Sequence, residues 1–299
     1  MNGKRLAALI LCLAALLHAG WALAQERPEG ECSMPEKMTM RIMTANIWGD
    51  YFENPVQLRE DAFIEAFAAY HPDVIGLQEM TQSWYDSRMF AQLQERYAIV
   101  GAVLGEHVNY VPLAYAKERF ELLESGFQRY SDTPDRSKAI TYAVLQEKES
   151  GKLVAVCNTH FWWKSGKEHD LIRLENAREL VQRMRGLQQQ YDCPVFAFGD
   201  LNCALSSGVF DIFEENLVIR LHGIAENASR VSSHHGNPAL GADGRYHGKE
   251  PVNPDALSID HILGLLGEHP CEVTSYQVVL DQAVLDASDH SPVYADIAF

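Results

Sequence analysis

Short apolar segments that end abruptly in polar residues are the feature of this sequence that most limits its fold. Apolar runs of about four to eight residues are typical of buried strands. Ligands gather at strand ends, because loops converge there while the strands stay rigid. A single carboxylate after a strand is more often a helix cap or a surface charge than a functional residue. The prediction of one polar site therefore depends on several polar strand ends occurring in order along the chain. The polar ends are Gln78-Glu79, Thr159-His160, Gly199-Asp200-Leu201-Asn202, and the late pair Asp260-His261 and Ser288-Asp289-His290.

The remaining pattern mixes hairpins with strand–helix alternation, which indicates mixed sheets with helices packed over them. We expect helices from Asn54-Pro55 to just before Pro72, over 83–93 and over 168–190. The stretch from Ser229 to Ala256, rich in Gly, Pro, Asn and His, is the least regular part, and such loops often carry function. Strands are expected at 38–47, 74–77, 97–103, 111–116, 120–127, 140–146, 153–158, 194–198, 259–263, 273–280 and 293–297.

The N-terminus has the features of a signal peptide. Lys4 and Arg5 precede an apolar core from Leu6 to Leu17, too short to span a bilayer, and Ala22-Leu23-Ala24 supplies the small residues that a signal peptidase reads. An uncleaved anchor is the alternative that this short core disfavours. We therefore expect a secreted or periplasmic protein with no stable membrane insertion after cleavage. Its parts would be a signal peptide (1–24), a flexible lead-in (25–37) and a single domain (38–299).

Charge limits the choice of partner. The chain has 25 Lys and Arg against 41 Asp and Glu, and its net charge of −16 becomes −18 when Lys4 and Arg5 leave with the signal peptide. Proteins that grip duplex nucleic acid neutralise many phosphates with basic residues, and here those residues are scattered, without a block or stripe. Composition therefore argues against a dedicated duplex binder, although a bound metal can still hold one phosphate.

Six motifs, taken in chain order, resemble the endonuclease/exonuclease/phosphatase superfamily, which includes pancreatic-type deoxyribonuclease, inositol-polyphosphate phosphatases, bacterial sphingomyelinases and deadenylases. The resemblance covers residues 40–299 and implies a four-layer αββα sandwich of the α/β (α+β) class, with two packed mixed sheets flanked by helices. The motifs are Thr44-Ala45-Asn46-Ile47, Leu77-Gln78-Glu79, Asn158-Thr159-His160-Phe161, Gly199-Asp200-Leu201-Asn202, Ile259-Asp260-His261-Ile262 and Ser288-Asp289-His290-Ser291-Pro292-Val293.

Electrostatics explains why a metal belongs with these residues. Two like charges about 4 Å apart in a pocket repel by roughly 4 kcal/mol, so clustered carboxylates need a cation unless some stay protonated. Oxygen ligands suit Mg²⁺, with Mn²⁺ or Ca²⁺ as alternatives. The resemblance implies that Glu79 is the main metal ligand, helped by Asn46 and Asp289. Some relatives carry an additional Asp ligand where this chain has Trp48, which weakens the case for a second tightly held metal.

The resemblance also implies five catalytic residues. Asp200 would orient or deprotonate the attacking water, and Asn202 would hold that water or a phosphate oxygen. Asp260 and His290 would form a carboxylate–imidazole pair that contacts the phosphate. His160 would bind a non-bridging oxygen or serve the leaving group.

Four more residues are candidates for substrate binding, each with a plainer alternative. Tyr115 lies where relatives place a phosphate-contacting Tyr, and Arg173 is a candidate phosphate contact or part of a solvated helix face. Trp162, with Trp163, is either an aromatic wall for a ring or core packing. His247 lies in a segment that often shapes substrate access. His234 and His235 are weaker metal candidates, since adjacent histidines are usually solvated.

We therefore expect an exported, monomeric, metal-dependent hydrolase that cleaves a phosphodiester or phosphomonoester by in-line attack of water. Its substrate would be a phosphorylated small molecule, a phospholipid headgroup or a single-stranded nucleic acid. The first alternative is a secreted nuclease acting on DNA or RNA. A more remote one is an inactive binding module on the same fold, which the intact Glu79, Asp200 and His290 disfavour.

Overall fold

A computed structural model describes residues 37–105 and 107–299. The predicted signal peptide lies outside the described residues, as does the lead-in apart from Lys37, so both stay predictions. Met38–Phe299 forms one compact unit. Within the described residues, no helix is long and apolar enough to cross a bilayer.

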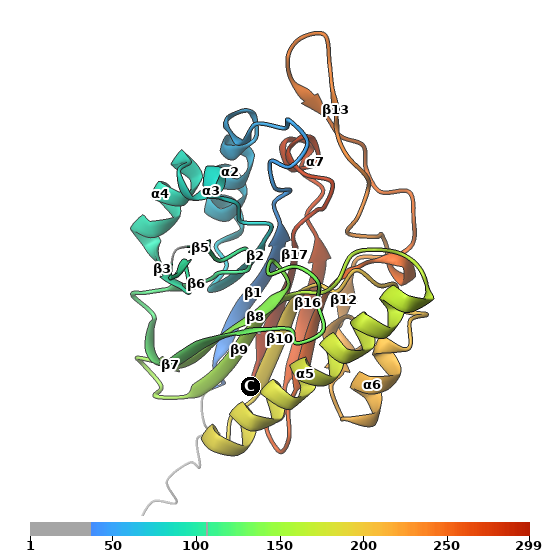
Figure 1. The fold of residues 1–299 in the computed structure, drawn as a ribbon. Coiled ribbons are helices and arrows are strands. Elements are labelled where there is room, and N and C mark those ends of the chain that lie inside the picture. The colour runs from blue at the N-terminus through green and yellow to red at the C-terminus, as the bar shows by residue number, and fades with distance from the viewer. Residues whose placement is uncertain (1–36, 106) are drawn as a thin grey trace, which may run out of the picture. The chain divides into compact units, whose positions relative to one another are not determined.

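Two mixed β-sheets lie face to face at the centre of this unit (Figure 1). The seven-stranded sheet has the order β12-β16-β17-β1-β2-β6-β3, and the six-stranded sheet has the order β11-β15-β10-β9-β8-β7. In the first, the strands are β1 (Thr39–Asn46), β2 (Val74–Gln78), β3 (Tyr97–Val100), β6 (Leu113–Ala116), β12 (Asn227–Ala228), β16 (Glu272–Val278) and β17 (Val293–Ala298). In the second, they are β7 (Phe120–Arg129), β8 (Ala139–Glu147), β9 (Leu153–His160), β10 (Val195–Asp200), β11 (Ile219–Arg220) and β15 (Asp260–Leu265).

The central strand β10 is apolar on both faces because both faces are covered. Its Phe196 and Phe198 belong to the core that includes the space between the sheets, whereas Val195 and Ala197 belong to a second core. That second core lies under α5 (Lys167–Tyr191) and α6 (Val209–Glu215). A strand buried on both faces has a continuous apolar sequence instead of an alternating one.

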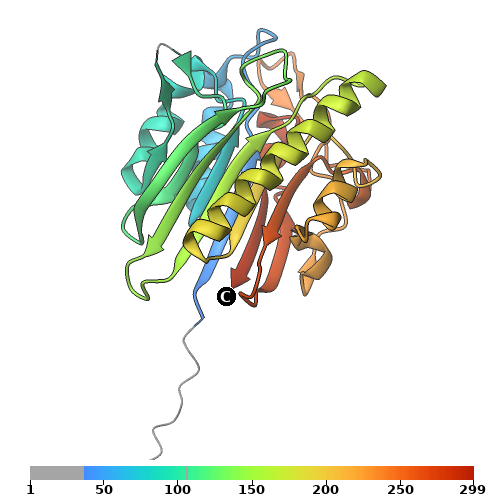
Figure 2. The ribbon, with the colours of Figure 1, turned by 60° about the horizontal axis from the view of Figure 1, so that its bottom comes forward.

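Helices cover the outer faces of both sheets, which completes the four layers. Figure 2 shows α5 lying across the six-stranded sheet, with helices of the N-terminal half on the far side. Phe63 and Phe67 of α2 (Glu60–Tyr70) and Leu93 of α4 (Arg88–Arg96) enter the same core as β1. The helix α7 (Gln282–Ala287) packs against α2. The predicted αββα sandwich is therefore confirmed.

Several element boundaries differ from the predicted ones. The first helix begins at Glu60, after a 3₁₀ turn at Val56–Leu58, and not at Pro55. The second divides into α3 (Gln82–Tyr85) and α4, because the Ser87 side chain accepts a hydrogen bond from Phe90 N and caps a new helix. The strand expected over 97–103 ends at Val100, since Gly101 has a φ of +71°. The pattern does not predict α6 or α7, because so few residues make no more than about two turns.

The segment from Ser229 to Ala256 has little regular structure, as expected. It contains the hairpin β13 (Ala239–Leu240) and β14 (Tyr246–His247), and the 3₁₀ turn Asp255–Leu257 closes it. A second small hairpin pairs β4 (Val103–Leu104) with β5 (His107–Val108), and the last 3₁₀ turn is Leu221–Ile224. Figure 1 shows β13 at the tip of a loop that projects beyond the sheets.

Candidate active site

The polar strand ends predicted from the sequence meet at one edge of the two sheets. In the seven-stranded sheet, β1 and β2 are parallel and end side by side, with Asn46 opposite Gln78. In the six-stranded sheet, β9 and β10 are parallel, with His160 opposite Asp200. The antiparallel β15 begins at the same edge, with Asp260 also opposite Asp200. Strand direction alone therefore brings these side chains together.

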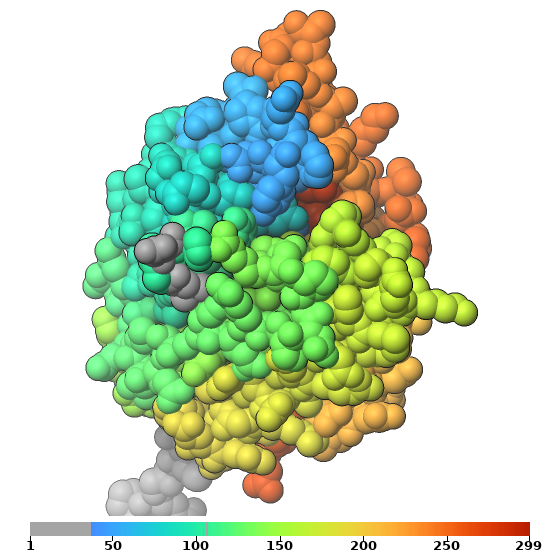
Figure 3. All heavy atoms as spheres, in the orientation of Figure 1, coloured from blue at the N-terminus to red at the C-terminus, as the bar shows by residue number. Residues whose placement is uncertain are grey.

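A cleft of about 540 Å³ opens over this edge. Figure 3 shows a hollow between the blue segment near residue 50 and the yellow-green segment near residue 165, with red atoms of the C-terminal part in it. The volume lies within the range of small-ligand sites, about 300–1,000 Å³. Its lining includes Glu79, Lys138, His160, Asp200, Asn202, His234, Asp289 and His290, with Trp48, Tyr51, Phe52, Tyr110 and Trp163 among the aromatic residues.

Two motif residues tie the sheets together under the cleft. Asn158 of β9 donates hydrogen bonds to the carbonyl oxygens of Leu77 and Pro112, at 2.7 and 2.8 Å. Its own side-chain oxygen accepts from Gln78 Nε2 at 2.6 Å. All of these groups are buried, where an unpaired amide would be costly. Gln78 and Asn158 therefore have a structural role in the motifs. They hold the two sheets in register and so position Glu79 and His160.

Three residues that line the cleft have a strained backbone. Trp48, Glu79 and Asn202 have φ values of +55°, +61° and +50°, a region that bulky residues seldom adopt. Gly199 has a φ of +153°, and a Cβ there would lie 1.9 Å from the carbonyl oxygen of Thr159. The Gly-Asp-Leu-Asn motif thus needs its glycine so that β10 can approach β9. Strained conformations of this kind cluster at functional sites.

Oxygen-bearing side chains of the seven-stranded sheet line one side of the cleft. Glu79 accepts hydrogen bonds from Asn46 Nδ2 at 3.1 Å and from Gly49 N at 2.8 Å. Burial raises the pKa of Asp289, and the charge of Glu79 raises it further against the effect of His290. Burial would raise the pKa of Glu79, but the charges of His160 and Lys138 lower it, so Glu79 is held ionised. Carboxylate and amide oxygens in that setting fit a hard divalent cation.

Basic side chains of the six-stranded sheet dominate the other side. Asp200 Oδ2 lies 3.3 Å from His160 Nε2, and its Oδ1 accepts from Asn202 N at 2.8 Å. Burial would raise the pKa of Asp200, but the charges of His160, His290 and Lys138 outweigh burial and lower it. Asp200 is therefore a buried and fully ionised carboxylate.

His290 joins the two sides. Its Nδ1 donates to Asp260 Oδ2 at 2.8 Å, and its Nε2 lies 3.9 Å from Asp200 Oδ2. Ser233 Oγ also donates to Asp260 Oδ2, at 2.6 Å. Burial lowers the pKa of His290, but Asp260, Asp289 and Asp200 together raise it well above the usual value. The predicted pairing of Asp260 with His290 is therefore present in the structure.

Lys138 is a site residue that the sequence analysis above does not single out. Its Nζ lies 2.7 Å from His160 Nε2, and the side chain is buried against the charges of Glu79 and Asp200. The hairpin formed by the predicted strands 140–146 and 153–158 would have indicated its position. Because Ile140 pairs with Thr159, the residues just before Ile140 lie beside His160.

Two predicted substrate contacts of the loop after β9 are corrected by the structure. Trp162 is buried and donates its indole N–H to His169, whereas the neighbouring Trp163 is 55% exposed and lines the cleft. Arg173 is also buried, donating to the carbonyl oxygens of Trp162 and Lys164 and pairing with Asp170. Its guanidinium holds this loop together, so it is not a phosphate contact.

Tyr115 and His247 also lie away from the cleft. Tyr115 pairs with Val74 at the start of β2, so the length of that strand separates it from Glu79. Tyr110 lines the cleft instead. His247 is exposed on β14, where it contacts Asp243. In contrast, His234, which the sequence favours only weakly, lines the cleft next to His290.

Comparisons with known proteins agree with this geometry. Nocturnin of Homo sapiens is 26% identical over 168 residues, covering 52% of this chain and 38% of nocturnin. The human 2′,5′-phosphodiesterase 12 is 24% identical over 294 residues, covering 83% of this chain and 46% of that protein. The chain thus spans less than half the length of these two relatives. A mannosyl-6-phosphatase of Bacteroides thetaiotaomicron shares the fold, with a TM-score of 0.66, 18% identity, and coverage of 87% of this chain and 100% of that one.

The family assignment comes from most of the chain. Residues 43–290 match the model described as the Endonuclease/Exonuclease/phosphatase family. This range contains the cleft residues from Trp48 to His290, and it confirms the family expected from the six motifs. The protein therefore belongs to the endonuclease/exonuclease/phosphatase family.

Proposed function

We propose that this protein is a metal-dependent phosphoesterase that hydrolyses a phosphate ester by in-line attack of water. The observation that carries the proposal is the setting of Asp200. A buried, ionised carboxylate lies at the floor of the cleft with His160 and His290 on its flanks and the oxygen ligands Glu79 and Asp289 across from it.

The role of Asp200 follows from its lowered pKa. A weakly basic carboxylate is a poor acceptor for a full proton transfer near neutral pH, but it remains a strong hydrogen-bond acceptor. Asp200 would therefore orient the attacking water, with the Asn202 side chain at the same end of β10. Asn46 Nδ2 and Asn202 N hold the carboxylate in place, so little reorganisation is needed when the water binds.

Three donors would hold the phosphate. Lys138, His160 and His290 all line the cleft and surround Asp200. Preorganised donors aimed at developing charge stabilise a transition state strongly in a site shielded from water. Asp260 and Ser233 fix the ring of His290 through Nδ1, so that Nε2 is the nitrogen that faces the cleft.

Asn46, Glu79 and Asp289 would hold the metal. Their oxygen atoms fit Mg²⁺ best, with Mn²⁺ and Ca²⁺ as alternatives. When bound, the cation would offset charge on a phosphoryl oxygen.

The rim of the cleft supports a substrate with a ring. Tyr51, Phe52 and Trp163 are 50%, 73% and 55% exposed at the entrance, where an aromatic base or another ring can stack. The two named activities among the compared proteins, a 2′,5′-phosphodiesterase and a mannosyl-6-phosphatase, include a diesterase and a monoesterase. Because the chain has a net charge of −16, we favour a phosphorylated small molecule or a single-stranded nucleic acid as substrate over duplex DNA.

A secreted nuclease is the second candidate, supported by the same aromatic rim. The signal-peptide pattern of residues 1–24 supports export to the periplasm or the medium. We propose that the exported protein acts as a monomer.

The experiment is a substrate panel with purified protein. It would contain bis(p-nitrophenyl) phosphate, p-nitrophenyl phosphate, nucleotides, inositol phosphates, sphingomyelin, and single-stranded and duplex DNA and RNA. Each would be assayed with Mg²⁺, Mn²⁺, Ca²⁺ or excess EDTA, and the Asp200→Asn variant would measure contaminating activity. We expect turnover that EDTA abolishes and Mg²⁺ or Mn²⁺ restores. Full turnover in EDTA, with the metal content of the protein measured, would contradict the proposal.

A further inference from the structure

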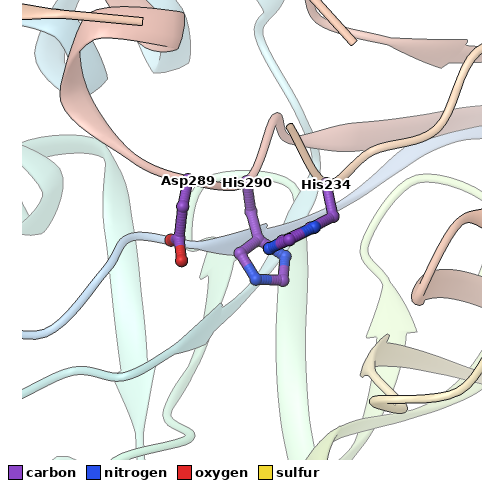
Figure 4. Close-up of side chains that lie close together, drawn as sticks. All are labelled: His234, Asp289 and His290. Carbon is purple, nitrogen blue, oxygen red and sulfur yellow. The ribbon is translucent and has the colours of Figure 1, made fainter. Parts of the chain in front are cut away.

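His234 forms a compact cluster with two cleft residues. Atoms of His234, Asp289 and His290 that can bind a metal lie within 4.8 Å of one another. The two imidazole rings are 4.9 Å apart between centroids, at an interplanar angle of 70°. Figure 4 shows the rings side by side, with Asp289 next to His290 on the same loop. His234 has no role in the hydrolysis proposed above.

Backbone pairing builds this cluster. His234 and His290 face each other across an antiparallel bridge, and two further hydrogen bonds extend the contact. Ser291 N donates to Ser233 O at 2.7 Å, and His235 N donates to Asp289 O at 3.0 Å. Residues directly opposite in an antiparallel pair present their side chains to the same face. The two histidines are therefore adjacent because of the backbone, and no ligand is needed to assemble them.

The ring of His290 already has the orientation of a metal ligand. A metal-binding histidine commonly donates its other ring N–H to a carboxylate, which fixes the tautomer. Here Nδ1 donates to Asp260 Oδ2 at 2.8 Å, which leaves Nε2 available toward the cleft. Two ligands at about 2.2 Å from one ion lie at most about 4.4 Å apart, so a small side-chain adjustment would close the cluster around an ion.

We propose that His234, Asp289 and His290 form a binding site for a transition-metal ion of the Zn²⁺ class, which shares Asp289 with the oxygen-ligand site at Asn46 and Glu79. Two imidazoles and one carboxylate suit Zn²⁺, Co²⁺ or Ni²⁺, whereas Mg²⁺ prefers oxygen ligands throughout. Three protein ligands leave a coordination position open to water.

Occupation of this site inhibits hydrolysis. The ion takes His290 Nε2 away from the phosphate and takes Asp289 away from the cation held with Glu79. The inhibitory effect rests on the proposed function, but binding of the ion does not. Zn²⁺ would therefore act as an inhibitor of an enzyme that uses Mg²⁺, through a residue, His234, that the hydrolysis itself does not use.

The test measures binding directly. Protein freed of transition metals is kept in saturating Mg²⁺. It is titrated with Co²⁺, whose visible d–d absorption reports nitrogen ligation, and with Zn²⁺ by calorimetry. We expect one tight site per chain, and a loss of affinity of at least about tenfold in His234→Ala. His247→Ala removes an exposed histidine outside the cleft and is the matched control, expected to bind as the unmodified protein does. His234→Gln, which is closer to histidine in size, repeats the measurement if His234→Ala is unstable in a thermal melt.

The outcomes separate the two proposals. If folded His234→Ala and His234→Gln bind Co²⁺ as tightly as the unmodified protein, with the same spectrum, the site is wrong. Displacement of Co²⁺ by Mg²⁺ at equal affinity would overturn it as well, because that result indicates an oxygen-ligand site. Turnover in Mg²⁺ without Zn²⁺ tests the proposed function alone. If both proposals hold, Zn²⁺ inhibits the His234 variants at least about tenfold more weakly, relative to the activity of each variant without Zn²⁺.

Discussion

The two sides of the cleft carry carboxylates in opposite electrostatic settings. On the seven-stranded side, burial and the charge of Glu79 raise the pKa of Asp289. On the six-stranded side, His160, His290 and Lys138 lower the pKa of Asp200 despite complete burial. The same side-chain chemistry therefore supports two roles, because the neighbours differ. The seven-stranded side supplies the oxygen ligands that fit a cation, and the six-stranded side supplies basic groups that fit a phosphate, while His160 and Lys138 also act on Glu79.

The two sheets contribute different groups to the site. Here β1, β2 and the start of β17 provide the oxygen ligands, and β8, β9 and β10 provide the basic groups and Asp200. His290, just before β17, reaches across to Asp260 of β15. Residues whose environments push their pKa values apart are typical of acid and base assignments in active sites.

Asp200→Asn should have the largest effect. A neutral amide is a weaker hydrogen-bond acceptor for the attacking water than an ionised carboxylate, so we expect turnover to fall about 10²- to 10⁴-fold. The fold should remain, because the lost charge lies at a strand end. Steady-state kinetics with bis(p-nitrophenyl) phosphate measure the effect, and Asp211→Asn, on the exposed face of α6, is the control. Normal turnover in folded Asp200→Asn would show that Asp200 has no catalytic role.

Lys138→Met should come next. It removes the ammonium group beside His160 and keeps an apolar stem of similar length, so we expect turnover to fall about 10²-fold, as for loss of one charged donor to the transition state. Metal affinity should not fall, because Lys138 provides no ligand and its positive charge near Glu79 opposes binding of a cation. Kinetics together with calorimetric titration of Mn²⁺ separate these effects. A large change in Mn²⁺ affinity with unchanged turnover would contradict the division between the two sides. Lys249→Met, at an exposed position that does not line the cleft, is the control.

Glu79→Gln should weaken metal binding by at least about 10-fold, the lower bound found for losing even an outer-shell partner of a metal ligand. High Mg²⁺ or Mn²⁺ should restore much of its turnover, whereas no metal concentration should restore Asp200→Asn. The measurement is the dependence of turnover on metal concentration, with Glu65→Gln, exposed on α2, as control. Equal rescue of both variants would show that the two sides are not distinct.

His261→Gln should have no direct effect on chemistry but should change acid stability. Burial, with a contribution from Arg220, lowers the pKa of His261 to about 4, opposite to the shift of His290. Between an unfolded pKa near 6.5 and the folded value, the unfolded state binds the proton more readily, so stability falls as the pH falls through that window. We expect His261 to account for about 3 kcal/mol of that loss.

Urea unfolding at pH 7 and pH 4 would measure this contribution. His261→Gln should lose less stability than the unmodified protein over the same interval. His107→Gln, at an exposed position, should lose the same amount as the unmodified protein. Identical pH dependence in His261→Gln and the unmodified protein would assign the acid sensitivity to other groups.

Most of the fold could be predicted from the sequence, because its strands are strongly apolar and their polar ends are local features. The positions of Asn46, Glu79, His160, Asp200, Asp260 and His290 at one cleft follow from strand direction once the sheets are assigned. The misassignment of Trp162 arises in the loop after β9. Trp162 and Trp163 are adjacent and equally aromatic, and only the loop built around Arg173 decides which one faces the cleft.

The sequence by itself thus determined the layers and the chemical types at the site, since apolar periodicity and strand-end polarity are encoded within a few residues. The tertiary structure alone decided which distant groups share a charge environment. Lys138, just before a strand, carries no local mark of function, and His234, in an irregular loop, carries only a weak one. Each becomes a site residue through pairing with a segment far along the chain, Lys138 beside His160 and His234 beside His290. Electrostatic effects act through space over a few ångströms, and such proximity is a property of the folded chain.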